Sequence, residues 1–470
     1  MATLGPATDG DEALVAIVRA GVDVVRLNLS HGSVEQHLER LRRVRSAATV
    51  VGKPIGVLAD LPGPKVRAGE FPTPGVQLVA GSVIRFEVGH GPSDAELIRV
   101  DYPGFMDDVA VGDRVVIGDG AIRARVDRLE ATAAVAVVEN GGRAQGCPGV
   151  HLPSERSRLT TPTAEDLVLA ETMASAGVEF IAVSFVRAAA DMTAVRGVVG
   201  DRAHLVAKIE TSTALGNLTE IIAVSDAIMV ARGDLGIDCP FEDVPHLQKS
   251  IVRQCVEFGV PVITATQMLE SMVTAPAPTR AEVSDVANAV FDGTDALMLS
   301  AETAVGVAPA QVVATMSRIA ERAEAEANYQ QWSEWLGRLQ REHWLSPGDR
   351  ITAALTHAAA QAARDAGAAA ILCCTRTGRT TRAMARFRPK AQLIGLSPVA
   401  STVNRMTLSW GIDPIEVDTY TTTDEMVWFA VQTAFDQGKI AAGDTVLVLA
   451  GAPDRQSTAA ADVLRIVQVA

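Results

Sequence analysis

The chain has 470 residues, of which 48% are hydrophobic, and at roughly 150 residues per domain it has room for about three domains. Its 56 Asp and Glu residues outnumber its 42 Lys and Arg residues, which gives a formal net charge of -14. This acidic balance argues against a partner as phosphate-rich as nucleic acid, so we expect any phosphate to bind in a local pocket.

The cysteines and the N-terminal segment indicate the compartment. The five cysteines are scattered and lack paired C-x-x-C spacing, which predicts neither a disulfide framework nor a zinc site. The segment MATLGPATDGDEAL has no basic region followed by an apolar one, and no uncharged apolar run is long enough to cross a membrane. We therefore expect a soluble, cytoplasmic protein without a membrane partner.

Short apolar runs that end in polar residues recur along the chain, and segments with helical spacing lie between them. The runs cover residues 2–7, 22–30, 54–60, 180–186, 204–210, 227–234, 261–267 and 295–302. Parallel strands need such helical crossovers, so the alternation predicts an α/β fold with a (β/α)₈ TIM barrel. A doubly wound open sheet has the same alternation and stays open as the alternative.

Two parts of the chain depart from this alternation. Residues 64–156 contain strand-like runs such as VIRFEVG and GDRVVIGDG, with no helix among them, which predicts a small all-β barrel inserted as a lid. The TIM barrel is then built from residues 1–63 and 157–330. Residues 331–344 are predicted to form a helical connection to a separate α/β domain at residues 345–470.

Polar residues cluster where the predicted strands end, which is where a barrel of this type gathers its active site. They are Arg26, Asn28, Ser30, Asp60, Lys208, Glu210, Arg232, Asp234, Thr264, Thr266, Ser300 and Glu302. Alternate residues of a strand face the same side, so we expect Lys208 and Glu210 to point together, and likewise Arg232 and Asp234.

These charges indicate a site for a metal and an anion. Glu210 and Asp234 at one rim would repel each other without a cation between them, and a hard divalent ion, Mg²⁺ or Mn²⁺, suits their oxygens. Lys208 and Arg26 beside the ion would clamp a transferring phosphoryl group. Gly233 lets backbone N–H groups approach a ligand, and a short helix begun there would attract a carboxylate.

A purely structural interpretation is open for each residue taken alone. Charges at strand ends commonly form salt bridges, and Thr264 and Thr266 can satisfy backbone groups. His31 in NLSHG can be a turn residue rather than a nucleotide contact.

Several long motifs resemble the pyruvate kinase family over nearly the whole chain. They are RLNLSHG, KIET, IMVARGDLGI, TATQMLESM, PAPTRAEVSDVANAVFDGTDALMLSAETAVG and WGIDPIEVD. The resemblance implies a TIM barrel, an inserted lid and a C-terminal effector and oligomerisation domain. It also implies a glycolytic phosphotransferase that moves the phosphoryl group of phosphoenolpyruvate to ADP, giving pyruvate and ATP, and a homotetramer.

The resemblance assigns roles to residues at matching positions. Glu210 and Asp234 would bind Mg²⁺, Lys208 would stabilise the phosphoryl group in flight, and Gly233 and Asp234 would receive the substrate carboxylate through their N–H groups. Thr266 would bind that end of the substrate and lie on the proton path, together with Ser300. The nucleotide contacts would be Arg26, Asn28, His31 and Arg67.

The resemblance also raises the question of a monovalent cation. Many members hold K⁺ at the positions of Asn28, Ser30 and Asp60 and have Glu where this chain has Lys65. Members with Lys there are generally independent of K⁺, so we expect the ammonium of Lys65 to replace the ion and K⁺ not to be required. The alternative is that Lys65 is a solvated loop charge.

In three places this sequence departs from the usual motifs of the family. The family usually has a TKI-like run before ATLGPA, and this chain starts inside that strand. Pro148 replaces a lid lysine that reaches toward nucleotide phosphate in the family. The loop TRTGRTTR matches the family's phosphate loop, but APDRQSTAA at 452–460 lacks the usual glycine-rich turn.

The candidate effector loop offers hydroxyl groups, a glycine and a cation to a phosphorylated allosteric effector. Its residues are Thr375, Thr377, Gly378, Arg379 and Thr380. A sugar monophosphate, AMP and no effector at all stay open, as does a plain strand-to-helix turn.

Two other functions stay open as alternatives. A metal-dependent lyase acting on pyruvate enolates would also use Glu and Asp around Mg²⁺. A non-catalytic paralogue serving as a regulatory subunit would be consistent with Pro148 and the short N-terminus.

Overall fold

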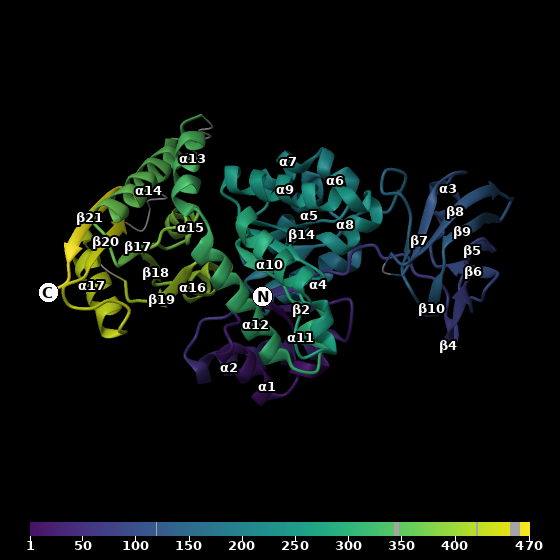
Figure 1. The fold of residues 1–470 in the computed structure, drawn as a ribbon, viewed down its shortest axis with the longest axis horizontal. Helices are drawn as coiled ribbons and strands as arrows, with labels where there is room; N and C mark the ends of the chain where they lie inside the picture. The colour runs from purple at the N-terminus through teal and green to yellow at the C-terminus, as the bar shows by residue number, and fades with distance from the viewer. Residues whose placement is uncertain (119, 343–346, 420–421, 452–460) are drawn as a thin grey trace.

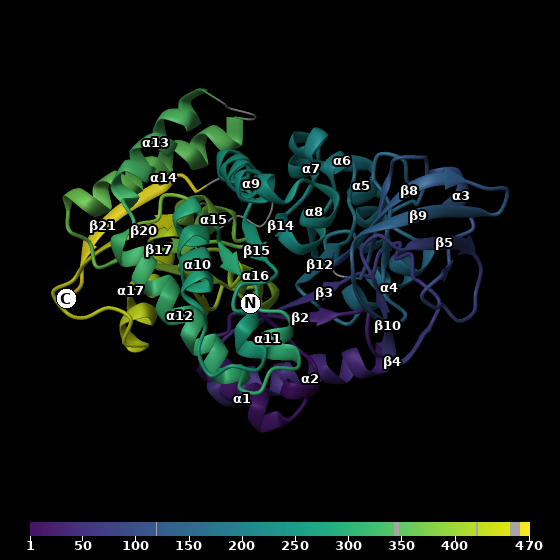
Figure 2. The same cartoon turned by 45° about the vertical axis from the view of Figure 1, so that its right-hand side comes forward.

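The computed structural model describes residues 1–118, 120–342, 347–419, 422–451 and 461–470. Three parts lie in a row, with a barrel in the middle, the strands β4 to β10 to one side and the sheet β17 to β21 to the other (Figure 1). The same arrangement is seen after a 45° turn (Figure 2).

The central part is a parallel sheet whose strands follow one another in chain order, β1-β2-β3-β12-β13-β14-β15-β16. The strands are β1 (Ala2–Thr3), β2 (Val24–Asn28), β3 (Gly56–Asp60), β12 (Phe180–Val183), β13 (His204–Ile209), β14 (Ala227–Ala231), β15 (Val262–Ala265) and β16 (Ala296–Leu297). Thr3 N donates to Leu299 O and Leu299 N donates to Met1 O, both at 3.0 Å, so the last strand's continuation bonds to the first. The predicted TIM barrel is confirmed, and the open doubly wound sheet is wrong for this chain.

Helices connect the barrel strands, and polar N-caps and glycine C-caps bound several of them. The helices that follow the barrel strands are α1 (Asp11–Arg19), α2 (Val34–Val51), α4 (Ala164–Ser175), α5 (Ala189–Val199), α7 (Leu218–Val224), α9 (Val244–Phe258), α10 (Arg280–Asp292) and α12 (Pro309–Glu326). The hydroxyls of Ser33, Thr163 and Thr279 accept from the third N–H group of α2, α4 and α10. The short helices are η1 (Pro6–Thr8), α6 (Ser212–Gly216), α8 (Arg232–Asp238), η2 (Phe241–Asp243), η3 (Glu270–Val273) and α11 (Ala301–Ala304).

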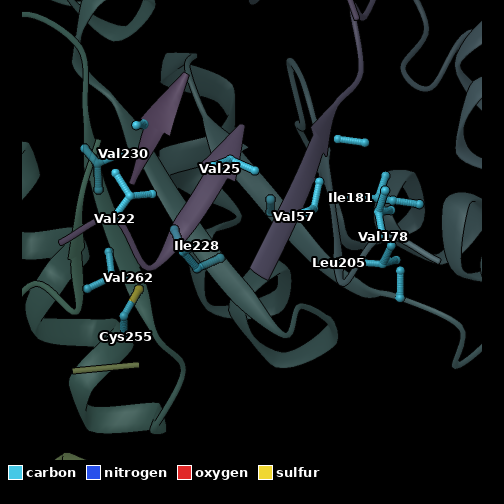
Figure 3. Packing of buried hydrophobic residues seen from close by; sticks show 14 of the residues in the cluster. Val22, Val25, Val57, Val178, Ile181, Leu205, Ile228, Val230, Cys255 and Val262 are labelled. Carbon is cyan, nitrogen blue, oxygen red and sulfur yellow. The ribbon is translucent and has the colours of Figure 1, made fainter. Parts of the chain in front are cut away.

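Strand residues alternate between two buried clusters, as a closed sheet requires. The cluster outside the barrel lies against the helices and includes Val25, Val57, Leu205, Ile228 and Val262. Figure 3 shows these side chains together with Cys255 of α9. The second cluster is formed by the alternate strand residues, which point inward and fill the barrel interior. Its members include Val24, Leu58, Ala182, Val206 and Met229.

An all-β part lies between β3 and β12. Its strands are β4 (Phe71–Leu78), β5 (Val83–Val88), β6 (Leu97–Val100), β7 (Arg114–Ile117), β8 (Ile122–Leu129), β9 (Ala133–Asn140), β10 (Gly142–Gly146) and β11 (Val150–His151). Six of them form the sheet β11-β7-β8-β9-β5-β6 over their own buried cluster. The expectation of no helix here is wrong, because one turn, α3 (Phe105–Asp108), is anchored by the fully buried Phe105.

The C-terminal part begins with α13 (Tyr329–Glu342) and α14 (Pro347–Asp365) and has a five-stranded sheet of order β19-β18-β17-β20-β21. The strands are β17 (Ala370–Cys374), β18 (Gln392–Ser397), β19 (Ile412–Glu416), β20 (Thr445–Ala450) and β21 (Val463–Gln468), and β21 is antiparallel to β20. Helices α15 (Arg379–Ala385), α16 (Ala400–Met406) and α17 (Thr423–Asp436) complete it. The segment 452–460, which differs from the family's glycine-rich turn, lies outside the described residues, and the predicted domain boundaries stay predictions.

Within the described ranges, no helix is both long enough and apolar enough to span a membrane.

Candidate active site

Alternate side chains of the barrel strands point inward, and this alternation places three charged residues at the C-terminal end of the barrel. Arg26, Asp60 and Lys208 each follow an interior residue by two positions, namely Val24, Leu58 and Val206. They therefore extend the inner layer of side chains to the rim. The expectation that these strands end in a polar cluster is met by their register.

The rim charges form an alternating chain of cations and carboxylates. Arg26 Nε donates to Asp60 Oδ2 at 2.7 Å, and Lys208 Nζ lies 3.3 Å from Asp60 Oδ1 and 2.9 Å from Glu210 Oε1. Lys208 Nζ also donates to Ser184 Oγ at 2.6 Å. Each buried charge thus has an opposite charge beside it, which offsets the cost of removing it from water.

The pairing determines the charge states of Asp60 and Lys208. Burial lowers the pKa of Lys208, but the carboxylates of Asp60 and Glu210 outweigh burial, so the pKa is raised above its usual value. Burial raises the pKa of Asp60, but the charges of Lys208 and Arg26 outweigh burial and leave it below its usual value. The two groups are a firmly charged ammonium and carboxylate at neutral pH.

Glu210 follows directly after β13, and one of its two carboxylate oxygens can still accept a ligand. Its Oε2 accepts a hydrogen bond from Phe185 N at 2.6 Å. Its Oε1 is buried and has no hydrogen bond of good geometry among the described residues, although Lys208 Nζ is near. Burial, opposed by Lys208 and reinforced by the negative charge of Asp234, raises the pKa of Glu210 to about 7.

Asp234 lies on a helix, not on a strand as predicted. Strand β14 ends at Ala231, and α8 begins at Arg232, so Asp234 is in its first turn. The expectation that Arg232 and Asp234 share one face of a strand is wrong, because the chain turns at Ala231 with φ -91° and ψ 81°. The expected short helix near Gly233 is present.

Arg232 turns away from the rim charges and holds the next strand end. Its Nη2 donates to Thr266 O at 2.6 Å, its Nε donates to Ala265 O at 3.2 Å, and its Nη1 donates to Asp285 Oδ1 at 2.7 Å. Thr266 has a φ of 70°, a left-handed conformation that is costly for a β-branched residue. Arg232 therefore stabilises a strained turn rather than binding an anion.

Thr266 and Gly233 meet at this turn. Gly233 N donates to Thr266 Oγ1 at 2.8 Å, and Thr266 Oγ1 donates to Ala265 O at 2.6 Å. The first turn of α8 and the end of β15 are thereby fixed to each other, as a shared ligand site requires.

Other predicted strand-end residues are occupied with structural bonds. Thr264 is fully buried and donates to the side-chain hydroxyl of Thr294 at 3.1 Å, rather than to a backbone group as the structural interpretation expected. Glu302 is also fully buried and accepts from Leu269 N and Ser300 N, at 3.1 and 2.6 Å. The structure brings neither Thr264 nor Glu302 to the cavity described next, and Ser300 is not among its lining residues.

A cavity of about 1040 Å³ lies between the barrel rim and the all-β part. Its barrel side includes His31, Phe185, Glu210 and Asp234. The other side includes Arg67, Ile117, Ile122, Pro148 and His151. The volume is at the upper end for a small-molecule site and suffices for two ligands side by side.

Lys65 brings a further cation to the wall of this cavity. Its Nζ donates to Ser30 Oγ at 3.0 Å, and Asn28 Oδ1 accepts from Ser30 N at 3.2 Å. Partial burial and the positive charge of Lys208 lower the pKa of Lys65, while Asp234, Asp60 and Glu210 oppose them. The ammonium is thus close enough to respond to the whole cluster.

The cation-rich side of the cavity continues to His31 and Arg67. Partial burial and the charges of Lys65 and Arg67 lower the pKa of His31, which favours neutral imidazole. Arg67 Nη1 donates to Cys147 O at 3.2 Å, and Ala68 N donates to Pro148 O at 2.8 Å. Pro148 therefore lies at the joint where the all-β part returns to the barrel.

The candidate effector loop lies far from this site, where β17 meets α15. Gly378 is left-handed with φ 78°, and its N–H donates to Thr375 Oγ1 at 3.0 Å. Thr377 and Arg379 are exposed and Thr380 is buried. The loop forms an ordered turn at the start of a helix.

Sequence reasoning missed Ser184 and Phe185 beside Lys208 and Glu210. They lie in the run FIAVSFV, which carries no charge or glycine signal. The one available signal was their place directly after a predicted strand. Over the described residues, no group of three or more His, Cys, Asp or Glu side chains is arranged to hold a metal, so Glu210 and Asp234 would need ligands from elsewhere.

Comparison with known proteins identifies relatives for nearly the whole chain. The family model described as "Pyruvate kinase, barrel domain" matches residues 1–313, and "Pyruvate kinase, alpha/beta domain" matches residues 353–467. A pyruvate kinase of Methylorubrum extorquens is 40% identical over 96% of this chain and 93% of its own length. Those of Clostridium acetobutylicum and Mycobacterium intracellulare are 36% and 38% identical, over 97% and 96% of this chain and 96% and 94% of theirs.

Proposed function

The chain belongs to the pyruvate kinase family, and we propose that the charges at its barrel rim carry out the phosphoryl transfer of that family. The reaction moves the phosphoryl group of phosphoenolpyruvate to ADP and yields pyruvate and ATP. The observation that carries the assignment is the alternating chain from Arg26 through Asp60 and Lys208 to Glu210, whose last member lines a cavity large enough for both substrates.

A divalent metal fits the two carboxylates of this site. Glu210 Oε1 is buried without a good hydrogen bond among the described residues, and Asp234 lines the same cavity. Oxygen donors of this kind suit Mg²⁺ or Mn²⁺, with water and substrate oxygens as further ligands. A bound metal would supply positive charge to the oxygens of the transferring group.

We propose that Lys208 and Arg26 stabilise the phosphoryl group during transfer. Lys208 is buried, Arg26 is half-buried and Asp60 aligns both cations, so neither needs to reorganise when charge develops on the phosphoryl oxygens. The N–H groups of Asp234 and Gly233 receive the substrate carboxylate at the first turn of α8, with Gly233 N exchanging its bond to Thr266 Oγ1 for the substrate. Arg67 contacts the nucleotide from the all-β side of the cavity, and His31, Asn28 and Arg26 contact it from the barrel side.

Thr266 is proposed to act on the enolate that the transfer leaves behind. Its hydroxyl is held between Gly233 N and Ala265 O, beside the proposed carboxylate site. The methylene carbon of the enolate must gain a proton to become pyruvate. Thr266 orients the water path that delivers this proton, and Ser300 is a more distant member of the path.

We further propose that Lys65 takes the place of a monovalent cation, so K⁺ is not required. Its ammonium binds Ser30 and responds to Asp60, Glu210 and Asp234. Equal rates in Na⁺, K⁺ and Tris buffers are expected. A large stimulation by K⁺ would contradict this role.

Three properties extend the proposal beyond the barrel. By family, the chain is proposed to be a homotetramer that works in the cytoplasm. The exposed Thr377 and Arg379 of the loop at 375–380 are proposed to bind a phosphorylated effector. The family has a lysine at the position of Pro148, so this chain lacks that positive charge. Arg67 is therefore proposed to neutralise more of the negative charge of the nucleotide.

Pyruvate formation from phosphoenolpyruvate, assayed with Mg²⁺ and with and without ADP, tests the proposed function. Formation that requires ADP supports it. Pyruvate formed equally without ADP would indicate the lyase alternative. A chain that is inert with Mg²⁺, K⁺ and candidate effectors would indicate the regulatory paralogue.

A further inference from the structure

Two crossing segments join the all-β part to the barrel, and the second is attached near its start to a carboxylate of the barrel. The first covers residues 61–70, between β3 and β4, and the second covers residues 152–163, between β11 and α4. On the second segment, Ser154 bonds twice to Asp238, the last residue of α8. Its N–H group donates to Asp238 Oδ1 at 3.0 Å, and its hydroxyl donates to Asp238 Oδ2 at 2.6 Å.

Asp238 also holds the helix that follows Glu210. Its Oδ2 accepts from Ser212 N at 2.6 Å, and Ser212 is the first residue of α6, two positions after Glu210. The hydroxyls of Ser212 and Thr213 lie 3.1 and 3.2 Å from Ser154 Oγ. Because the Ser154 hydroxyl donates to the carboxylate, its oxygen is the acceptor for these two groups. The crossing segment, α6 and α8 are thus joined at one point.

The elements joined there adjoin both carboxylates of the proposed metal site. Asp234 lies one helical turn before Asp238 on α8, and α6 begins just after Glu210. Ser154 and Asp238 line the same cavity as these two carboxylates. In Figure 1, α6 and α8 lie on the side of the barrel that faces β7. Hydrogen bonds to an ionised acceptor are stronger than neutral ones, so Asp238 is suited to hold the elements at fixed distances.

The attachment at Ser154 also controls the position of Arg67 on the first crossing segment. Ala68 N donates to Pro148 O at 2.8 Å, and Arg67 pairs with Gly149 as an antiparallel bridge. Ser154 follows Gly149 by a few residues, so a shift of Ser154 away from the barrel would carry Arg67 with it. Arg67 lines the all-β side of the large cavity.

Farther along, the second crossing segment has attachments of its own. Arg187 Nη1 donates to Ser157 O at 2.8 Å, and Thr161 Oγ1 donates to Ser184 O at 2.8 Å. Loss of the bonds at Ser154 alone should therefore loosen the start of the segment and leave the chain folded.

We propose that Asp238 is a positioning residue for the reaction: through Ser154 it sets the distance between the all-β part and the barrel rim, and thereby the affinity of Arg67 for the nucleotide. This role rests on the proposed function, in which Arg67 contacts the nucleotide. The N–H groups proposed for the substrate carboxylate belong to the barrel. A change at Ser154 should therefore affect ADP much more than phosphoenolpyruvate.

Steady-state kinetics of the full chain separate this role from a purely structural one. Ser154→Ala should raise KM for ADP about 10-fold and leave KM for phosphoenolpyruvate near the wild-type value, since one bond to a charged acceptor is lost. Ser154→Thr, which keeps a hydroxyl, should restore KM for ADP. Asp238→Asn should raise KM for ADP at least as much as Ser154→Ala. Asp243→Asn, an exposed change shortly after α8, is the control and should leave it unchanged. Equal KM values for ADP in Ser154→Ala and the wild type would overturn the proposal, as would equal rises for both substrates.

Hydrogen–deuterium exchange of the ligand-free chain tests the attachment without turnover. Because Ser154 N and Ser212 N both donate to Asp238, Asp238→Asn should speed exchange in peptides that span 152–158 and 211–216. Asp243→Asn should not. Unchanged exchange in both peptides of Asp238→Asn would overturn the proposal. An inactive wild type would contradict the proposed function alone, because the exchange rates and the Kd for ADP from calorimetry would still decide whether Asp238 positions the all-β part.

Discussion

The two ends of the barrel treat buried charge in different ways. At the C-terminal end, Arg26, Asp60, Lys208 and Glu210 alternate in sign, so each cation has a carboxylate within 3.3 Å. At the N-terminal end, Arg386 and Arg388 donate to backbone carbonyls where α9 and α10 end, and Asp295 lies 3.5 Å from Arg388. The comparison indicates that the paired charges at the C-terminal end prepare a site for a reaction, whereas the arginines at the N-terminal end join two parts of the chain.

A large loss of activity is expected when the charge of Glu210 is removed. Glu210→Gln keeps the shape but removes the charge that faces the proposed metal, so kcat should fall by at least about 100-fold. Binding of Mn²⁺, followed by electron paramagnetic resonance, should weaken in parallel. Glu220→Gln, an exposed change on α7, is the control; equal Mn²⁺ affinity in Glu210→Gln and wild type would exclude Glu210 as a ligand.

A smaller loss is expected when the support of the strained turn is removed. Arg232→Gln frees the carbonyls of Ala265 and Thr266, so the hydroxyl of Thr266 should lose its orientation. We expect kcat to fall about 10-fold to 100-fold while KM for ADP stays near the wild-type value. A stopped-flow measurement of enolpyruvate protonation separates this role from a loss of stability alone. An unchanged protonation rate in a destabilised variant would show that Arg232 is structural only.

The smallest effect concerns stability and comes from the N-terminal end. His204 begins β13, and burial lowers its pKa to about 3, with Arg382 and Arg405 contributing and Asp226 opposing. The unfolded chain therefore binds a proton near pH 6.5 that the folded chain resists, so His204 should destabilise the fold as pH falls from about 6.5 toward 4.

His204→Gln should make the unfolding temperature less dependent on pH in that window. His246→Gln, at an exposed position on α9, is the control. The same pH dependence in His204→Gln and the wild type would remove His204 from the account of acid stability.

Most of the charged residues at the barrel rim could be predicted from the sequence, because the alternation of inward and outward side chains along a strand is a local property. Arg26, Asp60 and Lys208 continue an alternating apolar pattern, and that pattern is enough to place them inside the barrel. Arg232 could not be placed in this way, since nothing local fixes the end of β14 at Ala231. One residue of extra strand reverses the side to which an arginine points.

The N-terminal end was harder to foresee. Arg386 and Arg388 in ARFRPK read as surface charges, because sequence alone does not show that α9 and α10 end beside them. Ser184 and Phe185 were missed for a related reason. Their contacts with Lys208 and Glu210 join strands that are neighbours only after the barrel closes.

The most direct measurement of the central claim is the rate of ADP-dependent pyruvate formation by Lys208→Met, with Mg²⁺ and without K⁺. Lys390→Met, an exposed change, serves as the control. Because Lys208 is the buried cation between Asp60 and Glu210, we predict a fall of several orders of magnitude, about 1,000-fold or more, in a chain that still binds phosphoenolpyruvate. A folded Lys208→Met variant with a rate close to that of Lys390→Met would contradict the account, because the balanced charges would then serve stability and not the reaction.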